Sequence, residues 1–271
     1  MVTALDDPAM ADSALDTGVY GYVIKPFDRN GVLISVANAL RRRQLEMETR
    51  AHRKSLEETV AERTTELQKS VATLRKALEG SIHAMALTVV MRDPYTAGHQ
   101  QRVATLACAI AEEMGLSADQ IDCIRMAATI HDLGKISIPA EILSKPGSIN
   151  EIEFNLIKAH PQVGYDILKP IEFPWPIARV VFQHHERLDG SGYPSGLSGE
   201  EILTEASVLG VADVVEAMAS HRPYRPAQGI DSALEEITQH RGTLYHPDVV
   251  DACLKVFREK EFEFEGRPRE K

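Results

Sequence analysis

In five predicted helices, apolar residues at helical spacing form a face that should point toward the core, and a titratable residue occupies the following position on that face. Ile152 and Leu156, for example, lead at a spacing of four to His160. The titratable residues reached in this way are His99, His131 with its neighbour Asp132, His160, the adjacent pair His184 and His185, and Asp213. We therefore expect five imidazoles and two carboxylates to converge inside the protein.

Such a convergence needs a chemical explanation. Burying an unpaired carboxylate or imidazole costs roughly several kcal/mol, so these groups are paired, hydrogen-bonded or bound to metal. Taken singly, each histidine is explained by a hydrogen bond inside the core, and one adjacent His-Asp pair is weak evidence. Together the seven groups have too many acceptors and too few donors to satisfy one another while neutral. Two divalent cations resolve this conflict, because imidazole suits Fe, Mn and Zn and a carboxylate can bridge two ions.

The segment HHERLDGSGYP (184–194) joins two of these histidines to a glycine-rich loop. Gly190 and Gly192 permit turns that a side chain would block. Tyr193 and Pro194 stiffen the rest of the loop. We interpret the loop as a rigid element that follows directly on two metal ligands.

Five motifs, in this order along the chain, resemble the HD-GYP family of the HD phosphohydrolase superfamily. They are RDPYTAGHQQRV (92–103), HDLGK (131–135), HPQVG (160–164), HHERLDGSGYP (184–194) and VADVVEAMASHRPYR (211–225). The resemblance covers nearly all of residues 83–258 and is highly specific. It implies an all-α fold, an HD-type helical bundle around a bimetallic centre that is often iron and sometimes manganese. The implied activity is hydrolysis of the bacterial second messenger cyclic di-GMP.

The resemblance also implies a ligand set. The metal ligands carried over are His99, His131, Asp132, His160, His184, His185 and Asp213, with Asp132 bridging the ions. Some family members hold a third metal through an acidic residue one turn before the first histidine. Tyr95 occupies that place here, so we expect two divalent ions.

The implied chemistry is in-line attack of a metal-activated hydroxide on one phosphodiester. Asp132 and Lys135 are the catalytic candidates, and Lys135 is also expected to bind the substrate. The alternative role of Lys135 is to cap helix carbonyls. Arg222 and Arg225 would hold the second phosphate or a guanine edge, because a guanidinium fork fits both; the alternative is a solvated basic loop. Tyr193 would stack on guanine, or pack its loop onto the fold.

The same loop residues, Gly192, Tyr193 and Pro194, are also a candidate docking site for a partner such as a diguanylate cyclase domain, as the family suggests. Three functions therefore compete. The leading one is a cyclic di-GMP phosphodiesterase that forms linear pGpG, with continuation to GMP left open. The others are a hydrolase of another cyclic dinucleotide and a catalytically weak cyclic-dinucleotide receptor or scaffold.

The elements that must position these residues form a run of helices over 83–258. Ser117 with Gln120 and Asn150 with Glu153 have capping-box spacing, which predicts two helix starts. The first helix is expected to run through Asp132 and the second to stop near His160. The charged tail, 259–271, is expected to fray.

A long charged helix is predicted over 37–82. Its apolar residues follow steps of three and four with flanking Glu, Lys and Arg, which favours a two-helix coiled coil and a homodimer. The seam includes Leu56, Val60, Leu67, Val71 and Leu74. The alternative is a single amphipathic helix lying on the catalytic domain.

The first 36 residues are too few to build a core of their own. VTALDD (2–7) and YVIKPF (22–27) resemble the last strands of a response-regulator receiver domain, with Thr3 as the switch threonine and Lys25-Pro26 as its Lys-Pro step. The strands that carry the phosphate-accepting aspartate in that family are absent from this sequence. We therefore expect a small α/β receiver remnant in a two-component signalling protein, without phosphorylation of this segment.

Composition sets the remaining limits. The net charge of −10 argues against binding to nucleic-acid polymers, and a phosphorylated ligand then needs a locally positive site. The three cysteines show no paired spacing, which favours a reducing compartment. No apolar stretch is long enough to cross a bilayer. We expect a cytoplasmic protein that does not associate with membranes.

Overall fold

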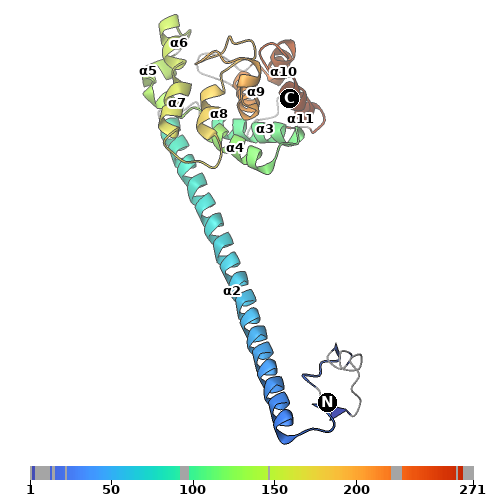
Figure 1. The fold of residues 1–271 in the computed structure, drawn as a ribbon. Helices are drawn as coiled ribbons and strands as arrows, with labels where there is room; N and C mark the ends of the chain where they lie inside the picture. The colour runs from blue at the N-terminus through green and yellow to red at the C-terminus, as the bar shows by residue number, and fades with distance from the viewer. Residues whose placement is uncertain are drawn as a thin grey trace. The chain divides into compact units, whose positions relative to one another are not determined.

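The computed structural model describes residues 2–3, 13, 16–21, 23–91, 98–145, 147–220, 228–260 and 262–264. The chain divides into two compact units, Met1–Arg75 and Lys76–Lys271. Helix α2 runs through the boundary between them (Figure 1). Among the described residues, no helix has the length and apolar character needed to cross a membrane.

The first unit contains two short strands and most of a long helix. Strands β1 (Val2–Thr3) and β2 (Val23–Ile24) pair in parallel, with Val2 opposite Val23. Helix α2 (Arg29–Val90) has 62 residues and extends beyond the predicted range 37–82 at both ends. Its C-terminal extension has a clear cause, because Ala86 and Val89 are buried in the core of the second unit.

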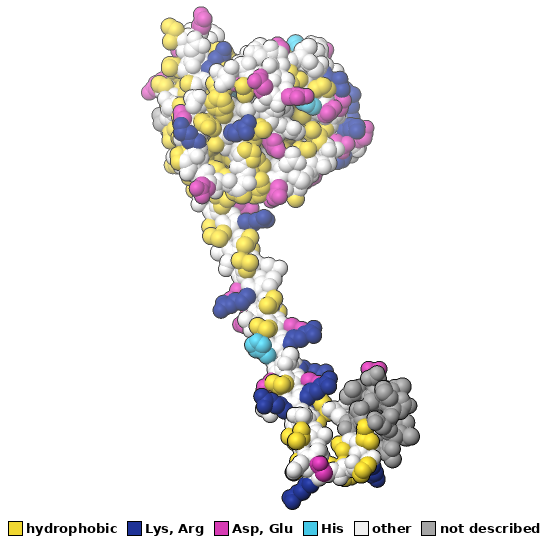
Figure 2. All heavy atoms as spheres, in the orientation of Figure 1, with side chains coloured by type: hydrophobic (Ala, Val, Ile, Leu, Met, Phe, Trp, Pro, Cys, Tyr) yellow, Lys and Arg dark blue, Asp and Glu magenta, His cyan; other side chains and the backbone are white. Residues whose placement is uncertain are grey.

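Helix α2 leaves its predicted seam uncovered by the described part of the chain. Leu67 is 65% exposed and Leu74 is 69% exposed. Figure 2 shows hydrophobic side chains alternating with charged ones along this helix. Arg42 pairs with Glu46 at 3.2 Å, an i,i+4 contact that supports the helix itself.

The second unit is built almost entirely of helices. Its elements are α3 (His99–Glu113), α4 (Ala118–Ile130), η2 (Leu133–Ser137), α5 (Ala140–Leu143), α6 (Glu151–Ile157), α7 (His160–Leu168), α8 (Ile177–Gln183), η3 (Gly199–Glu201), α9 (Thr204–Ala219), α10 (Ile230–Gln239) and α11 (Pro247–Arg258). Helix α9 packs against α3, α4, α8, α10 and α11 and is the centre of the bundle (Figure 1). The predicted all-α class of this domain is confirmed.

Apolar helix faces close the core around the expected polar residues. Leu106 and Ile110 on α3, Val180 on α8 and Leu209 on α9 are fully buried. Each lies on the predicted face that leads to a titratable residue. The hydrophobic core therefore surrounds the polar cluster instead of excluding it.

Both predicted capping boxes are present. The Ser117 side chain accepts from the Gln120 backbone, and the Asn150 side chain accepts from the Glu153 backbone. Helix α4 ends at Ile130, two residues before the predicted end at Asp132. The turn there matters, because it places His131 and Asp132 between two helical segments.

The predicted route to His160 is wrong. Ile152 is 76% exposed and Leu156 is 47% exposed, so they do not form a core-facing stripe. Helix α6 ends at Ile157, and His160 is the first residue of α7, with Pro161 in its first turn. Proline favours the first turn of a helix, so the break before it starts a new helix that carries His160 inward.

Residues 262–264 of the predicted tail are packed, whereas 261 and 265–271 lie outside the described residues. Phe264 is buried, and its ring lies 5.4 Å from that of Phe262 and 6.0 Å from that of Phe257. These aromatic contacts hold 262–264 against α11, which the charge-based expectation of fraying overlooked.

Candidate metal centre

The seven predicted ligands converge in the second unit from five helical segments and the turns beside them. His99 begins α3, His131 caps α4, Asp132 precedes η2, His160 begins α7, His184 and His185 follow α8, and Asp213 lies in α9. Six of these side chains are buried, and His185 is half-buried. The sequence prediction of a convergent polar cluster is therefore matched by the geometry.

The two carboxylates lie between the imidazoles. Asp132 has Oδ2 at 3.5 Å from His131 Nε2 and Oδ1 at 3.6 Å from His160 Nε2. Asp213 Oδ1 lies 3.2 Å from His99 Nε2 and 3.9 Å from His131 Nε2. Asp132 thus directs one oxygen toward each side of the cluster, the arrangement that a bridging carboxylate needs.

Three groups have the proximity that a metal ion requires, with ligand atoms all within 4.8 Å of one another. They are His160 with His184 and His185, His99 with His131 and Asp213, and His131 with Asp132 and His184. The first two groups share no residue. These two groups are therefore separate candidate sites for a cation.

Backbone carbonyls fix the tautomers of three histidines. The Nδ1 atoms of His131, His160 and His184 lie 2.7, 2.7 and 2.6 Å from the carbonyl oxygen three residues earlier. A carbonyl only accepts, so each Nδ1 carries the proton and donates. In a neutral ring the Nε2 atom is then unprotonated and presents its lone pair to the cluster.

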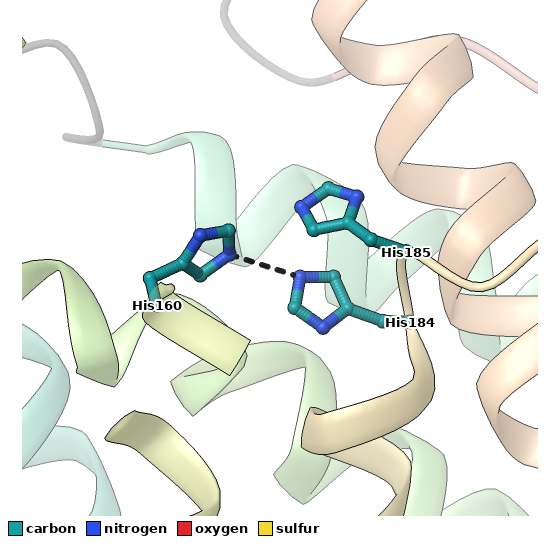
Figure 3. A group of neighbouring side chains, drawn as sticks. All are labelled: His160, His184 and His185. Atoms are coloured by element: carbon teal, nitrogen blue, oxygen red, sulfur yellow. Dashed lines mark hydrogen bonds between the residues drawn. The ribbon is translucent and has the colours of Figure 1, made fainter. Parts of the chain in front are cut away.

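Figure 3 shows the consequence. The Nε2 atoms of His160 and His184 face each other at 3.4 Å, although neither carries a proton in the tautomer that its Nδ1 contact requires. The Nε2 atom of His131 is buried without a hydrogen-bond partner among the described residues. Opposed lone pairs and an unpartnered nitrogen are unfavourable unless a cation lies among them, so the residues fit a metal centre.

The electrostatic environment keeps most ligands in their metal-binding form. Burial lowers the pKa of His160 to about 4 and that of His184 to about 3, so both rings are neutral near pH 7. Burial also holds the pKa of His185 well below its ordinary value. For Asp132, burial opposes ionisation, but Lys135 and the neighbouring histidines outweigh it and hold the pKa well below its ordinary value.

Glu216 is a functional candidate that the sequence analysis missed. It is buried one turn after Asp213 on α9, and its Oε2 contacts His99 Nδ1. Its other oxygen accepts from Arg102 Nε at 2.7 Å and from the Ser220 hydroxyl at 2.6 Å. The spacing of three from Asp213 was the available signal, because it places both carboxylates on one helix face.

These contacts orient His99. Burial opposes protonation of this ring, but Asp213 and Glu216 outweigh it and raise the pKa of His99 to about 9. Contacts with His99, Ser220 and Arg102 also overcome burial at Glu216 and lower its pKa to about 2. A carboxylate behind a histidine is the usual partner of a metal-bound imidazole.

Lys135 points into the cluster. Its Nζ lies 2.7 Å from Asp132 Oδ2, and its side chain is 13% exposed. Gly134 permits this turn, because a Cβ there would lie 1.9 Å from the His160 carbonyl oxygen. The HDLGK motif therefore packs η2 directly against the start of α7.

The loop after His185 folds back on the histidine pair. A Cβ on Gly192 would lie 2.4 Å from the Glu186 Cα, so only glycine fits this approach. Tyr193 and Pro194 are half-buried, and Tyr193 stacks on His185 with ring centroids 4.7 Å apart. Glu186, a second residue that the sequence analysis missed, is 4% exposed and accepts from the Ser195 and Leu197 backbone.

Three residues singled out in the sequence lie outside the described residues. They are Arg222 and Arg225, expected to bind substrate, and Tyr95, which stands where a third metal ligand would be.

Comparison with known proteins agrees with this geometry. A family model described as HD domain matches residues 83–249. The chain is 35% identical over 257 residues to "Cyclic di-GMP phosphodiesterase response regulator RpfG" of Xanthomonas campestris pv. campestris, covering 94% of this chain and 66% of the relative. It is 35% identical over 261 residues to a "Cyclic di-GMP phosphodiesterase" of Thermotoga maritima, covering 96% of this chain and 71% of the relative.

A third relative has a different name. The chain is 38% identical over 180 residues to "3'3'-cGAMP-specific phosphodiesterase 3" of Vibrio cholerae serotype O1, covering 66% of this chain and 39% of the relative. All three relatives are longer than the region they share with this chain. The match of the family model over most of the second unit, together with the convergent histidines and aspartates, establishes that the chain belongs to the HD domain family.

Proposed function

We propose that this protein is a metal-dependent phosphodiesterase that hydrolyses cyclic di-GMP to linear pGpG. The observation that carries the proposal is the pair of unprotonated Nε2 atoms facing each other at 3.4 Å beside the carboxylate of Asp132. The names of two relatives that match nearly the whole chain support the substrate.

The chain's own residues suit this reaction. Two bound divalent cations supply Lewis-acid stabilisation of phosphate charge and lower the pKa of water near the phosphorus. Asp132 would hold both ions, because its two oxygens lie toward different histidines of the cluster. Lys135, paired with Asp132 at 2.7 Å, provides a positive charge for the non-bridging oxygens of the scissile phosphate. The buried position of both groups excludes water that would weaken these charges.

Substrate contacts beyond the scissile phosphate are assigned to Arg222 and Arg225. These residues follow Asp213 by nine and twelve positions in the sequence. Their guanidinium groups suit the second phosphate or a guanine edge. They supply the local positive charge that a protein with a net charge of −10 needs for an anionic ligand.

Iron is the proposed metal, with manganese as the alternative. The ligand set of imidazoles and carboxylates without a thiolate suits either ion. The neutral rings of His160 and His184 and the ionised Asp132 match what these ions bind.

A second substrate class is supported by a specific observation. The relative from Vibrio cholerae that is 38% identical over 180 residues is named for 3'3'-cGAMP. Because cyclic di-GMP and 3'3'-cGAMP share the same cyclic phosphodiester, the metal centre alone does not choose between them. A catalytically weak receptor is the third candidate, but Lys135 and all seven ligands are present.

We also propose a homodimer through α2. The uncovered seam that includes Leu67 and Leu74 is suited to a second copy of the same helix. The parallel pairing of β1 with β2 supports a receiver remnant before α2, and one relative is named as a response regulator. We further propose that Gly192, Tyr193 and Pro194 form a docking site for a diguanylate cyclase domain.

The test is turnover on a panel of nucleotides by protein loaded with Fe²⁺ or Mn²⁺. We expect cyclic di-GMP to be opened to pGpG, with 3'3'-cGAMP, pGpG and a linear phosphodiester run in parallel. His131→Ala and Asp132→Ala are expected to lose ring opening, whereas Asp166→Ala, which removes an exposed carboxylate from α7, is expected to retain it. Undiminished ring opening in the first two variants would sink the mechanism.

A further inference from the structure

One of the five clustered histidines is held differently from the other four. His131, His160 and His184 donate from Nδ1 to backbone carbonyls, and His99 Nδ1 contacts Glu216. His185 has no side-chain hydrogen bond to any described residue. An imidazole without such a partner is free to turn about its last side-chain torsion, which would move its ligand atom away from an ion.

An aromatic stack takes the place of that hydrogen bond. The rings of Tyr193 and His185 are 4.7 Å apart with an interplanar angle of 30°. The neighbouring ring of His184 lies 4.0 Å away at 39°. A half-buried ring lying flat on an imidazole restricts its rotation, because any large turn drives one ring edge into the other face.

The loop has contacts that hold Tyr193 in this place. Its backbone N–H donates to the His185 carbonyl at 3.2 Å. The Glu186 carboxylate accepts from the backbone of Ser195 at 2.8 Å and of Leu197 at 3.0 Å, which fixes the far side of the loop. Lys158 Nζ lies over the Tyr193 ring at 5.6 Å from its centroid.

The contribution comes from the ring and not from the hydroxyl. The Tyr193 hydroxyl has no hydrogen-bond partner among the described residues, and burial raises its pKa, so it stays neutral. We propose that Tyr193 is a positioning residue, whose stacked ring fixes the orientation in which His185 binds a metal ion. This inference rests on the proposed metal centre and adds a role for the loop that follows it.

The experiment measures Mn²⁺ binding by equilibrium dialysis with elemental analysis. In Tyr193→Leu, which fills similar space without a ring, we expect one of two ions to bind about tenfold more weakly, within the usual effect of losing a residue that orients a ligand. Tyr193→Phe keeps the ring and is expected to bind both ions within about twofold of the unsubstituted protein. Tyr165→Leu is the matched control, because it removes a half-buried tyrosine that contacts Phe182 and not a ligand.

A double-mutant cycle tests whether Tyr193 acts through His185. His185→Ala is expected to weaken the same ion, and adding Tyr193→Leu to it is expected to change the affinity by less than about twofold, because the ring to be positioned is gone. Multiplicative loss in the double variant would show a general structural effect and overturn the proposal. Equal loss in the Phe and Leu variants would do the same, because it would assign the effect to the hydroxyl.

Folding is followed by thermal unfolding of the metal-free proteins, and Tyr193→Met replaces the Leu variant if that variant fails to fold. If the unsubstituted protein binds two Mn²⁺ ions and the Leu or Met variant binds them equally well, only this inference fails. If the unsubstituted protein binds no Mn²⁺ or Fe²⁺, the proposed function fails with it.

Discussion

The metal centre and helix α2 depart from ordinary burial in opposite directions. At the centre, His131, Asp132 and His184 are at most 2% exposed. Along α2, Leu67 is 65% exposed and Leu74 is 69% exposed. Buried polar groups and exposed apolar rows are each unfavourable without a partner, which is why we propose cations for the first region and a second copy of α2 for the second.

The two regions also differ in how firmly they are held. Imidazoles at the centre are fixed by carbonyl, carboxylate or ring contacts from separate elements. The residues of α2 up to Arg75 are supported mainly by contacts within the helix, such as the Arg53–Glu57 pair at 2.9 Å. Equivalent substitutions are therefore expected to have large effects at the centre and small ones on α2.

The largest difference in stability is expected when glycine is replaced by alanine in both regions. Gly134→Ala places a Cβ 1.9 Å from the His160 carbonyl oxygen, so η2 and α7 must separate. We expect about 3 kcal/mol of destabilisation and loss of metal. Gly80→Ala meets nothing within 4 Å in the interior of α2 and is expected to stabilise by about 0.5–1 kcal/mol. Chemical denaturation measures the free energy of unfolding of both variants. Effects of the same sign would contradict the difference in packing between the two regions.

The next effect concerns the carboxylate behind His99. Glu216→Gln keeps the size of the side chain but removes the charge that contacts His99 and Arg102. We expect a 10- to 100-fold loss of metal affinity, roughly, at the site that contains His99. Titration calorimetry with Mn²⁺ measures it. Glu235→Gln on the exposed face of α10 is the control, and equal affinities in the two variants would remove Glu216 from the site.

The seam of α2 is expected to respond more weakly. Leu67→Asp places a charge in the proposed dimer interface and forfeits roughly 1.5–3 kcal/mol of apolar burial, so we expect the dimer to dissociate at least about tenfold more readily. Gln68→Asp, one position away and exposed, is the control. Analytical ultracentrifugation reads the result, and identical sedimentation of the two variants would favour a single helix without a partner.

The smallest effect concerns the thiols of the core around the centre. Burial raises the pKa of Cys123 and of Cys253 to about 12. Almost none of these thiols is ionised at pH 8, so we expect iodoacetamide to leave both unmodified in the folded protein. A cysteine introduced at the exposed position Ser70 on α2 serves as the reactive reference. Labelling of Cys123 and Cys253 at the same rate as the cysteine at position 70 would mean that the core opens readily.

Regular helices account for most of the site residues that the sequence predicted. Helical periodicity located His99, His131, His184 and Asp213, because a regular helix converts spacing into direction. It predicted that His160 lies in the cluster but not which helix carries it there, since the break before Pro161 starts a new helix with its own direction.

Other features depended on contacts that periodicity does not encode. Glu216 meets Arg102 and His99 across two helices, so its role requires the packing of α3 on α9. The stack of Tyr193 on His185 depends on the path of an irregular loop. The expected substrate residues Arg222 and Arg225 lie outside the described residues.

Elemental analysis of anaerobically purified protein tests whether the seven clustered residues bind metal. We expect about two iron or manganese ions per chain, falling to one or none in Asp132→Ala, which removes the carboxylate that we propose bridges them. A fully folded protein that carries no transition metal under these conditions, and takes up none when Fe²⁺ or Mn²⁺ is supplied, would contradict the proposed metal centre.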